Sequence, residues 1–106
     1  MIDRARLAEL KHEIGDEDFE EVAEIFLEEM TETLDALAAN PLLVTPAAFH
    51  GLRGSASNLG FAGFAAACSE AEKQCQAGDA VDIAALVTLF HASVEAAADD
   101  LPAQAA

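Results

Sequence analysis

Residues 45–60 read TPAAFHGLRGSASNLG, and this stretch decides the fold. Thr45 followed by Pro46 is typical of a helix start, because threonine caps helix N-termini and proline is tolerated at the first helical position. Gly60 is typical of a helix end, because glycine readily takes the left-handed conformation that closes many helices. The stretch therefore predicts a helix that begins at Pro46 and runs to about Leu59.

This predicted helix has two chemically different faces. When successive residues are placed about 100° apart, one apolar arc contains Phe49, Leu52, Ala56 and Leu59. His50 lies roughly opposite that arc, so it is expected to face solvent. Within about 60° of His50 on the same side lie Ala47, Arg53, Gly54 and Ser57.

The residues beside His50 suit phosphoryl chemistry. An exposed imidazole is largely neutral at about pH 7, and its free ring nitrogen can attack phosphorus. Arg53, one turn along, can hold phosphoryl oxygens through charge-assisted hydrogen bonds. Gly54 costs about 1 kcal/mol relative to alanine inside a helix, and we interpret it as room for a partner's active site. His50 is therefore the predicted phospho-acceptor, and Gly54, Ser57 and Ala47 are expected to line the binding surface.

Four further helices are expected around this one. A short helix runs from about Asp3 to Glu13 and is closed by Gly15, and Asp16 or Asp18 is expected to cap the next. That long helix ends at Asn40-Pro41, and its inward stripe is predicted to contain Phe19, Val22, Ala23, Phe26, Met30, Leu34 and Leu37. Ile25 and Leu27 are expected at the edges of this stripe or off it, where they would help docking.

The C-terminal half also has apolar residues at helical spacing, which predicts two further helices. The fourth helix has a stripe of Phe64, Ala67, Cys68, Ala71 and Cys75 and ends at Gly78. Asp79 or Asp82 opens the last helix, whose inward residues are Ile83, Leu86, Val87, Phe90, Val94 and Ala97. The sequence therefore predicts an all-α antiparallel four-helix bundle with a short N-terminal helix as a lid. Residues 1–101 form the expected domain, and residues 102–106 form a tail.

Composition narrows the possible functions. The chain has 106 residues and a formal net charge of −15, which disfavours nucleic acid and anionic membranes as partners. No apolar run approaches the roughly 20 residues that span a bilayer, and no signal pattern follows Met1, so a cytoplasmic protein is expected. Cys68 and Cys75 lie about 10 Å apart along one helix, too far for a disulfide, and are expected to be small core residues.

A carboxylate is predicted near His50. If the third and fourth helices form a hairpin that turns near Phe61 and Ala62, the level of His50 is reached again near Glu72 and Lys73. Glu72 flanks the apolar stripe, whereas Lys73 points away. Glu72 is therefore a candidate to accept a hydrogen bond from one ring nitrogen and leave the other to react. The alternative is an ordinary solvated glutamate.

Other chemistry finds little support in the sequence. There is no glycine-rich loop that cradles phosphates, so neither ATP binding nor autokinase activity is expected. Cys68 and Cys75 lack the paired spacing of a zinc site. Glu9 and His12 match only one of the two Glu-x-x-His motifs that a di-iron bundle requires. No metal site and no cofactor are therefore expected in this chain.

The segment from His50 to Gly60 resembles the signature of histidine-containing phosphotransfer (Hpt) domains. That signature has an apolar residue two positions after the histidine, usually lysine after three, glycine after four and glycine after ten. The run from Leu7 to Leu27 and the hairpin that ends at Gly78 are also similar. Arg53 stands where lysine is commoner, which changes the geometry of the cation. Ala56 stands where serine is frequent.

This resemblance implies a phosphorelay role in two-component signal transduction. It implies that His50 forms phosphohistidine, that Arg53 supports the phosphate and that Gly54 gives clearance. The chain would be a stoichiometric carrier rather than an enzyme, monomeric, and served by Mg²⁺ from its partner. Expected partners are response-regulator receiver domains and a sensor histidine kinase or a hybrid form of one. The alternative is a non-catalytic acidic adaptor that binds a receiver or kinase without carrying phosphate.

Overall fold

The computed structural model describes residues 2–101, and every regular element in that range is a helix. The elements are α1 (Arg4–Ile14), α2 (Asp16–Ala39), the 3₁₀ turn η1 (Pro41–Leu43), α3 (Pro46–Asn58), α4 (Ala62–Gln76) and α5 (Ile83–Ala96). The predicted all-α class is therefore confirmed. None of the helices in this range is long and apolar enough to cross a membrane. The predicted tail, residues 102–106, lies outside the described residues.

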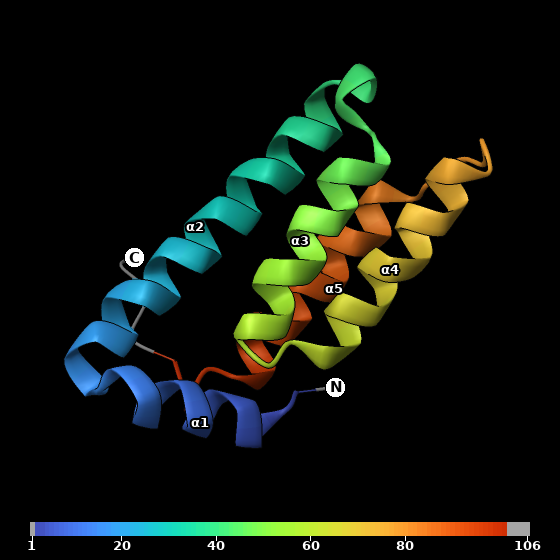
Figure 1. The fold of residues 1–106 in the computed structure, drawn as a ribbon. Coiled ribbons are helices and arrows are strands. Elements are labelled where there is room, and N and C mark those ends of the chain that lie inside the picture. Colours follow the sequence, from blue (N-terminus) through green and yellow to red (C-terminus); the bar gives the residue numbers. More distant parts are fainter. Residues whose placement is uncertain (1, 102–106) are drawn as a thin grey trace.

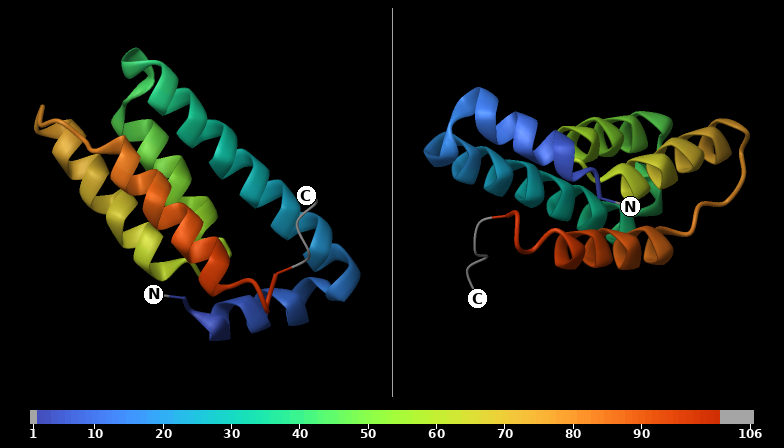
Figure 2. Two further views of the ribbon diagram at one scale, coloured as in Figure 1. Left: turned by 180° about the vertical axis from the view of Figure 1, so that it is seen from behind. Right: turned by 90° about the horizontal axis from the view of Figure 1, so that it is seen from below.

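The four long helices lie side by side, and each runs back along the one before it (Figure 1). Helices α3 and α4 form the pair in closest contact, and α5 packs against α4 and α2. Seen from behind, α5 covers the side of the bundle away from α3 (Figure 2). Helix α1 crosses the end of the bundle where α2 begins, and it contacts α2 and α3. The outer face of α3 is thereby left uncovered.

The predicted caps of two helices are present. The Thr45 hydroxyl oxygen accepts a hydrogen bond from the backbone N–H of Ala48 at 3.3 Å, with Pro46 in the first turn of α3. The Asp82 carboxylate accepts from the backbone N–H of Ala85 at 3.0 Å. These bonds satisfy amide groups that have no partner within the helix. The start of α3 is therefore set by local sequence.

The predicted cap of α2 was wrong. Neither Asp16 nor Asp18 caps the helix, because both already lie in its first turn, and Gly15 occupies the cap position with φ +83°. Gly15 is the single residue between α1 and α2, and it lets the chain turn sharply there. Because glycine has no side chain, α2 has no polar side-chain cap. The acids are still favourably placed, since the N-terminal end of a helix dipole attracts negative charge.

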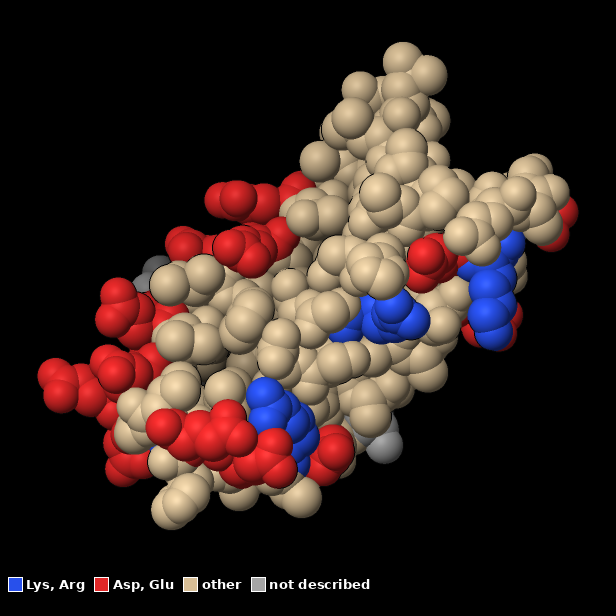
Figure 3. Space-filling model, viewed as in Figure 1, with Lys and Arg blue, Asp and Glu red and all other residues tan. Residues whose placement is uncertain are grey.

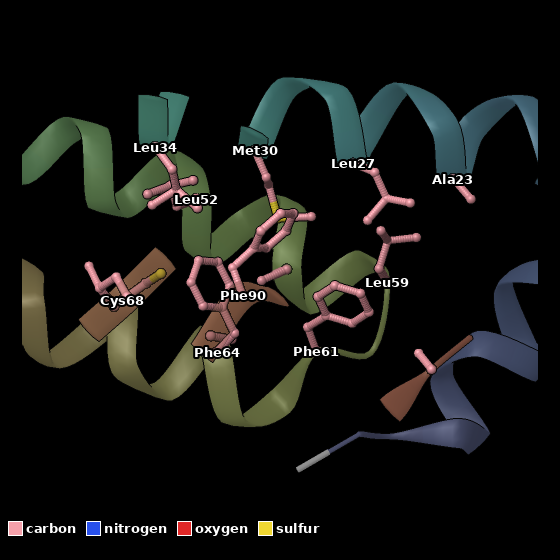
Figure 4. Packing of buried hydrophobic residues seen from close by; sticks show 14 of the residues in the cluster. Ala23, Leu27, Met30, Leu34, Leu52, Leu59, Phe61, Phe64, Cys68 and Phe90 are labelled. Carbon is pink, nitrogen blue, oxygen red and sulfur yellow. The ribbon is translucent and has the colours of Figure 1, made fainter. Parts of the chain in front are cut away.

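The core is built around phenylalanine rings that α3, α4 and α5 bring together (Figure 4). Phe49, Phe61 and Phe64 are fully buried, and the ring centroids of Phe64 and Phe90 are 5.4 Å apart in a tilted arrangement. Tilted aromatic pairs contribute about 1 kcal/mol beyond the area that they bury. This packing holds the inner face of α3 and turns its opposite face outward.

Leu27 corrects the predicted stripe of α2. The structure buries Leu27 to 5% exposure and leaves Val22 and Phe26 half-buried, whereas Ile25 is exposed as expected. Helix α2 contacts both α3 and α5, so its buried arc follows the direction between these two neighbours. Leu27 therefore belongs to the core and is not available for docking.

The turn between α3 and α4 also holds the N-terminal segment. Gly60 adopts φ +71°, and its carbonyl oxygen accepts a hydrogen bond from the backbone N–H of Asp3 at 2.6 Å. A Cβ atom at position 60 would collide with the backbone oxygen of Asp3. Helix α1, which follows this contact, buries Leu7 and Leu10 in the core. Gly60 therefore ends α3 and lets the backbone of the N-terminal segment come close.

The two cysteines are free and differ in environment, which predicts different reactivity. Cys68 is fully buried, and burial raises the pKa of its thiol to about 12. The thiol form therefore dominates at all lower pH values, and the nucleophilic thiolate is scarce. Cys75 is half-buried, with Sγ 3.6 Å from the carbonyl oxygen of Val44.

Iodoacetamide at about pH 8 is expected to modify Cys75 and spare Cys68 in the folded protein. Mass spectrometry of tryptic peptides over time gives the two rates separately. In denaturant both thiols are expected to react, because the burial that protects Cys68 is lost. Equal rates for the two cysteines in the native protein would contradict the described packing.

Candidate functional site

His50 projects from the outer face of α3. Its side chain is 63% exposed, whereas the preceding residue, Phe49, is fully buried. Leu52 and Ala56, which belong to the same inner arc as Phe49, are also buried. The predicted orientation of His50 is therefore observed: the packed inner arc turns the imidazole into solvent.

Arg53 contacts the imidazole directly. Its Nη2 donates a hydrogen bond to Nδ1 of His50 at 2.9 Å, one turn along α3. A guanidinium carries only donors, so Nδ1 acts as the acceptor in this contact. The sequence placed Arg53 beside His50 as a partner for phosphate. It gave no reason to expect a bond to the ring itself, because the side chain of an arginine three residues away can point toward the ring or toward solvent.

Glu72 approaches the same nitrogen from the neighbouring helix. Its Oε1 lies 3.7 Å from Nδ1 of His50, and its side chain is only 19% exposed. That separation is too long for a direct N–H···O hydrogen bond, and the contact is an ion pair only when the ring is protonated. Lys73 points away and pairs with Glu70 at 3.7 Å. Glu72 thus lies at the level of His50 on the α3–α4 hairpin, as predicted. The role of Glu72 in orienting the ring stays a prediction.

The backbone beside His50 is bare. Gly51 and Gly54 are exposed, and a Cβ atom built at either position meets nothing within 4 Å. Packing within the molecule therefore does not require glycine at these positions, although glycine weakens a helix interior. Ala47 and Ser57 are exposed one turn before and two turns after His50. Four of the predicted residues around His50 thus lie on one open strip of α3, namely Ala47, Arg53, Gly54 and Ser57. Glu72 lies beside this strip on α4.

Asn58 is a site residue that the sequence did not reveal. Its Nδ2 donates to the carbonyl oxygen of Gly54 at 3.2 Å, and its Oδ1 accepts from Nη2 of Arg6 at 3.3 Å. Arg6 lies in α1, far from Asn58 in the sequence. Local pattern carries no signal for such a long-range partner. Asn58 links the end of α3 to the N-terminal helix and so supports the strip that carries His50.

Charge is distributed unevenly over the surface. Figure 3 shows acidic side chains gathered along α2 and α1, while the area over α3 is mostly uncharged. Helix α2 has a series of aspartates and glutamates and no lysine or arginine. Within residues 2–101, no three His, Cys, Asp or Glu side chains gather closely enough to hold a metal ion. His50 therefore lies outside the acidic region, next to its own arginine.

A helical bundle with an exposed, charge-flanked histidine fits the class of phosphotransfer domains. The family model described as Hpt domain matches residues 21–100. The chain therefore belongs to the Hpt domain family, whose members act in phosphotransfer in two-component signalling. The matched range runs from within α2 to beyond α5 and contains the whole His50 site. No curated protein and no solved structure matches the chain.

Proposed function

We propose that this chain carries a phosphoryl group on His50, taking it from a receiver-domain aspartate or a kinase and passing it to another receiver aspartate. The observation that carries this proposal is an exposed imidazole beside helix glycines that no packing contact within the chain explains. Such glycines make sense where another molecule must approach the backbone closely.

The proposed transfer needs little from this chain. A lone pair of the imidazole attacks the phosphorus of an aspartyl phosphate and forms an N–P bond. The P–O bond to the aspartate breaks, and the carboxylate leaves with the electron pair. Positioning and electrostatic stabilisation dominate such reactions. The position of Arg53, with Nη2 2.9 Å from the ring, supports a role in donating charge-assisted hydrogen bonds to the transferred phosphoryl group.

The remaining requirements are assigned to the partner. We infer that the receiver domain supplies Mg²⁺ and that the chain itself neither binds ATP nor phosphorylates itself. The proposed partners are response-regulator receivers and a sensor or hybrid histidine kinase, met in the cytoplasm by a monomer. The same proposal takes α2–α5 as an antiparallel four-helix bundle and α1 as its lid, with residues 1–101 as one domain.

A transfer assay separates a carrier from an adaptor. A receiver labelled on its aspartate with radioactive phosphate is mixed with the wild-type chain and Mg²⁺, for each receiver of the host in turn. A carrier takes up the label as an acid-labile, base-stable adduct. An adaptor binds a receiver while the label stays on the receiver or is lost to water. Binding measured in parallel makes that second outcome visible, and it would contradict the proposal.

A further inference from the structure

Two groups with opposite hydrogen-bonding requirements meet at one nitrogen of His50. Arg53 Nη2 lies 2.9 Å from Nδ1, and Glu72 Oε1 lies 3.7 Å from the same atom. A guanidinium can only donate and a carboxylate can only accept. In a neutral ring Nδ1 either accepts from Arg53, with the proton on Nε2, or carries the proton and donates toward Glu72. It cannot satisfy both partners at once.

The distances favour the first of these two states at rest. The Arg53 contact lies in the normal hydrogen-bond range, whereas the Glu72 separation lies outside it. Nδ1 is therefore an acceptor, which puts the ring proton on Nε2. A protonated Nε2 has no lone pair in position to attack phosphorus. The other nitrogen has the lone pair, but Arg53 occupies its approach.

We propose that Arg53 and Glu72 form a tautomer switch that controls when His50 is nucleophilic. At rest Arg53 holds the ring with Nε2 protonated. When a phosphoryl group arrives, its oxygens draw Arg53 away from Nδ1, and the proton moves to Nδ1 and faces Glu72. Nε2 then bears the free lone pair. This inference rests on the proposed function and makes Arg53 and Glu72 positioning residues for it.

The proton count of the switch is balanced. One proton leaves Nε2 to water and one binds Nδ1 from water, so the ring stays neutral throughout. Solvent can exchange these protons because the His50 side chain is 63% exposed. Glu72 is less exposed, at 19%, so its attraction for an N–H at Nδ1 is screened less by water. The switch therefore requires withdrawal of the arginine hydrogen bond and a small approach of the Glu72 carboxylate, which now lies 3.7 Å from Nδ1.

The phosphorylated state would preserve the second arrangement. Once the N–P bond forms at Nε2, the ring keeps its proton on Nδ1 and carries a positive charge next to the Glu72 carboxylate. Arg53, freed from Nδ1, can bind the phosphoryl oxygens one turn away. The same arginine would thus hold the unphosphorylated ring unreactive and then stabilise the product.

The tautomer of His50 can be measured without any phosphate. Long-range ¹H–¹⁵N correlation spectra of the free protein, recorded about two pH units above the ordinary imidazole pKa, distinguish protonated from bare ring nitrogens. In wild type Nε2 is expected to be the protonated nitrogen. In Arg53→Met the ratio of tautomers should change about fivefold toward Nδ1–H, as loss of one exposed charged hydrogen bond predicts. In Glu72→Ala the ratio should move further toward Nε2–H.

Matched controls separate the switch from general charge effects. Lys73→Met removes a cation and Glu70→Ala an anion from α4, where they pair with each other. Both variants should leave the His50 ratio unchanged. The ring signals of His12 and His91 serve as internal references.

The result that would overturn the switch is a wild-type ring that is already protonated on Nδ1, or a ratio that does not respond to Arg53→Met. This outcome is distinct from failure of the carrier function. A correct tautomer response with no uptake of phosphate from any receiver supports control of the tautomer by Arg53 and Glu72 and rejects the carrier. Uptake of phosphate with an unresponsive tautomer does the reverse.

Discussion

Leucine in place of Gly54 is expected to slow phosphoryl transfer to His50 by about a hundredfold or more while the fold stays intact. Position 54 lies about one helical turn from His50 on the same exposed face. A receiver must bring its aspartate and metal to the ring across this surface, and a misplacement of about 1 Å can cost about a hundredfold in rate. A Cβ atom at position 54 meets nothing within 4 Å in this chain, so the obstruction is expected to act on the partner.

Stability measurements distinguish obstruction from misfolding. Gly54→Leu and Gly54→Ala should each raise the free energy of unfolding by about 0.5–1 kcal/mol, because both residues favour helix more than glycine does. Ala84→Leu places the same bulk at an exposed position of α5, on the other side of the bundle, and should not affect transfer. Unchanged transfer by a stable Gly54→Leu variant would show that the bare backbone has no role in docking.

Alanine at Gly60 is expected to destabilise the protein by about 2–4 kcal/mol, from its positive φ and the loss of the N-terminal contact together. The new Cβ would collide with the Asp3 backbone oxygen, so the N-terminal segment must move and lose its hydrogen bond to Gly60. Displacement would also expose part of the buried surface of Leu7 and Leu10. Chemical denaturation followed by circular dichroism measures the loss.

Gly78 is the matched control for this experiment. It has φ +80°, like Gly60, but a Cβ atom there meets nothing within 4 Å. Gly78→Ala should therefore lower the free energy of unfolding only by the cost of placing alanine at a positive φ, about 1–2 kcal/mol. Equal losses in the two variants would mean that the contact between Asp3 and Gly60 contributes no measurable stability.

The fold could be predicted wherever local chemistry decides the outcome. Thr45-Pro46 marks the start of α3 because capping depends on adjacent residues alone, and the apolar period of α3 places His50 on the outer face. Glu72 could be placed near His50 by counting residues across a short hairpin. These features depend on spacing within one helix or across one turn.

Features that depend on several helices could not be predicted in this way. Leu27 is buried because α3 and α5 both contact α2. The spacing of apolar residues in α2 does not show where those neighbouring helices lie. The link from Asn58 to Arg6 joins residues distant in sequence. Arg53 lies where expected, but its choice between the ring and solvent depends on the nearby Glu72 carboxylate and the rotamer of the arginine.

Comparison of the wild-type chain with His50→Gln is the most direct measurement of whether His50 carries phosphate. Each protein is mixed with a phosphorylated cognate receiver and Mg²⁺, and the adduct is located by peptide mapping under alkaline conditions. Glutamine keeps an exposed polar side chain on α3 but has no nucleophilic ring. The wild type should take up an acid-labile phosphate on the peptide that contains His50, and the variant should take up none. Label on His50→Gln equal to that on wild type, or on another residue of the wild type, would show that this imidazole is not the carrier.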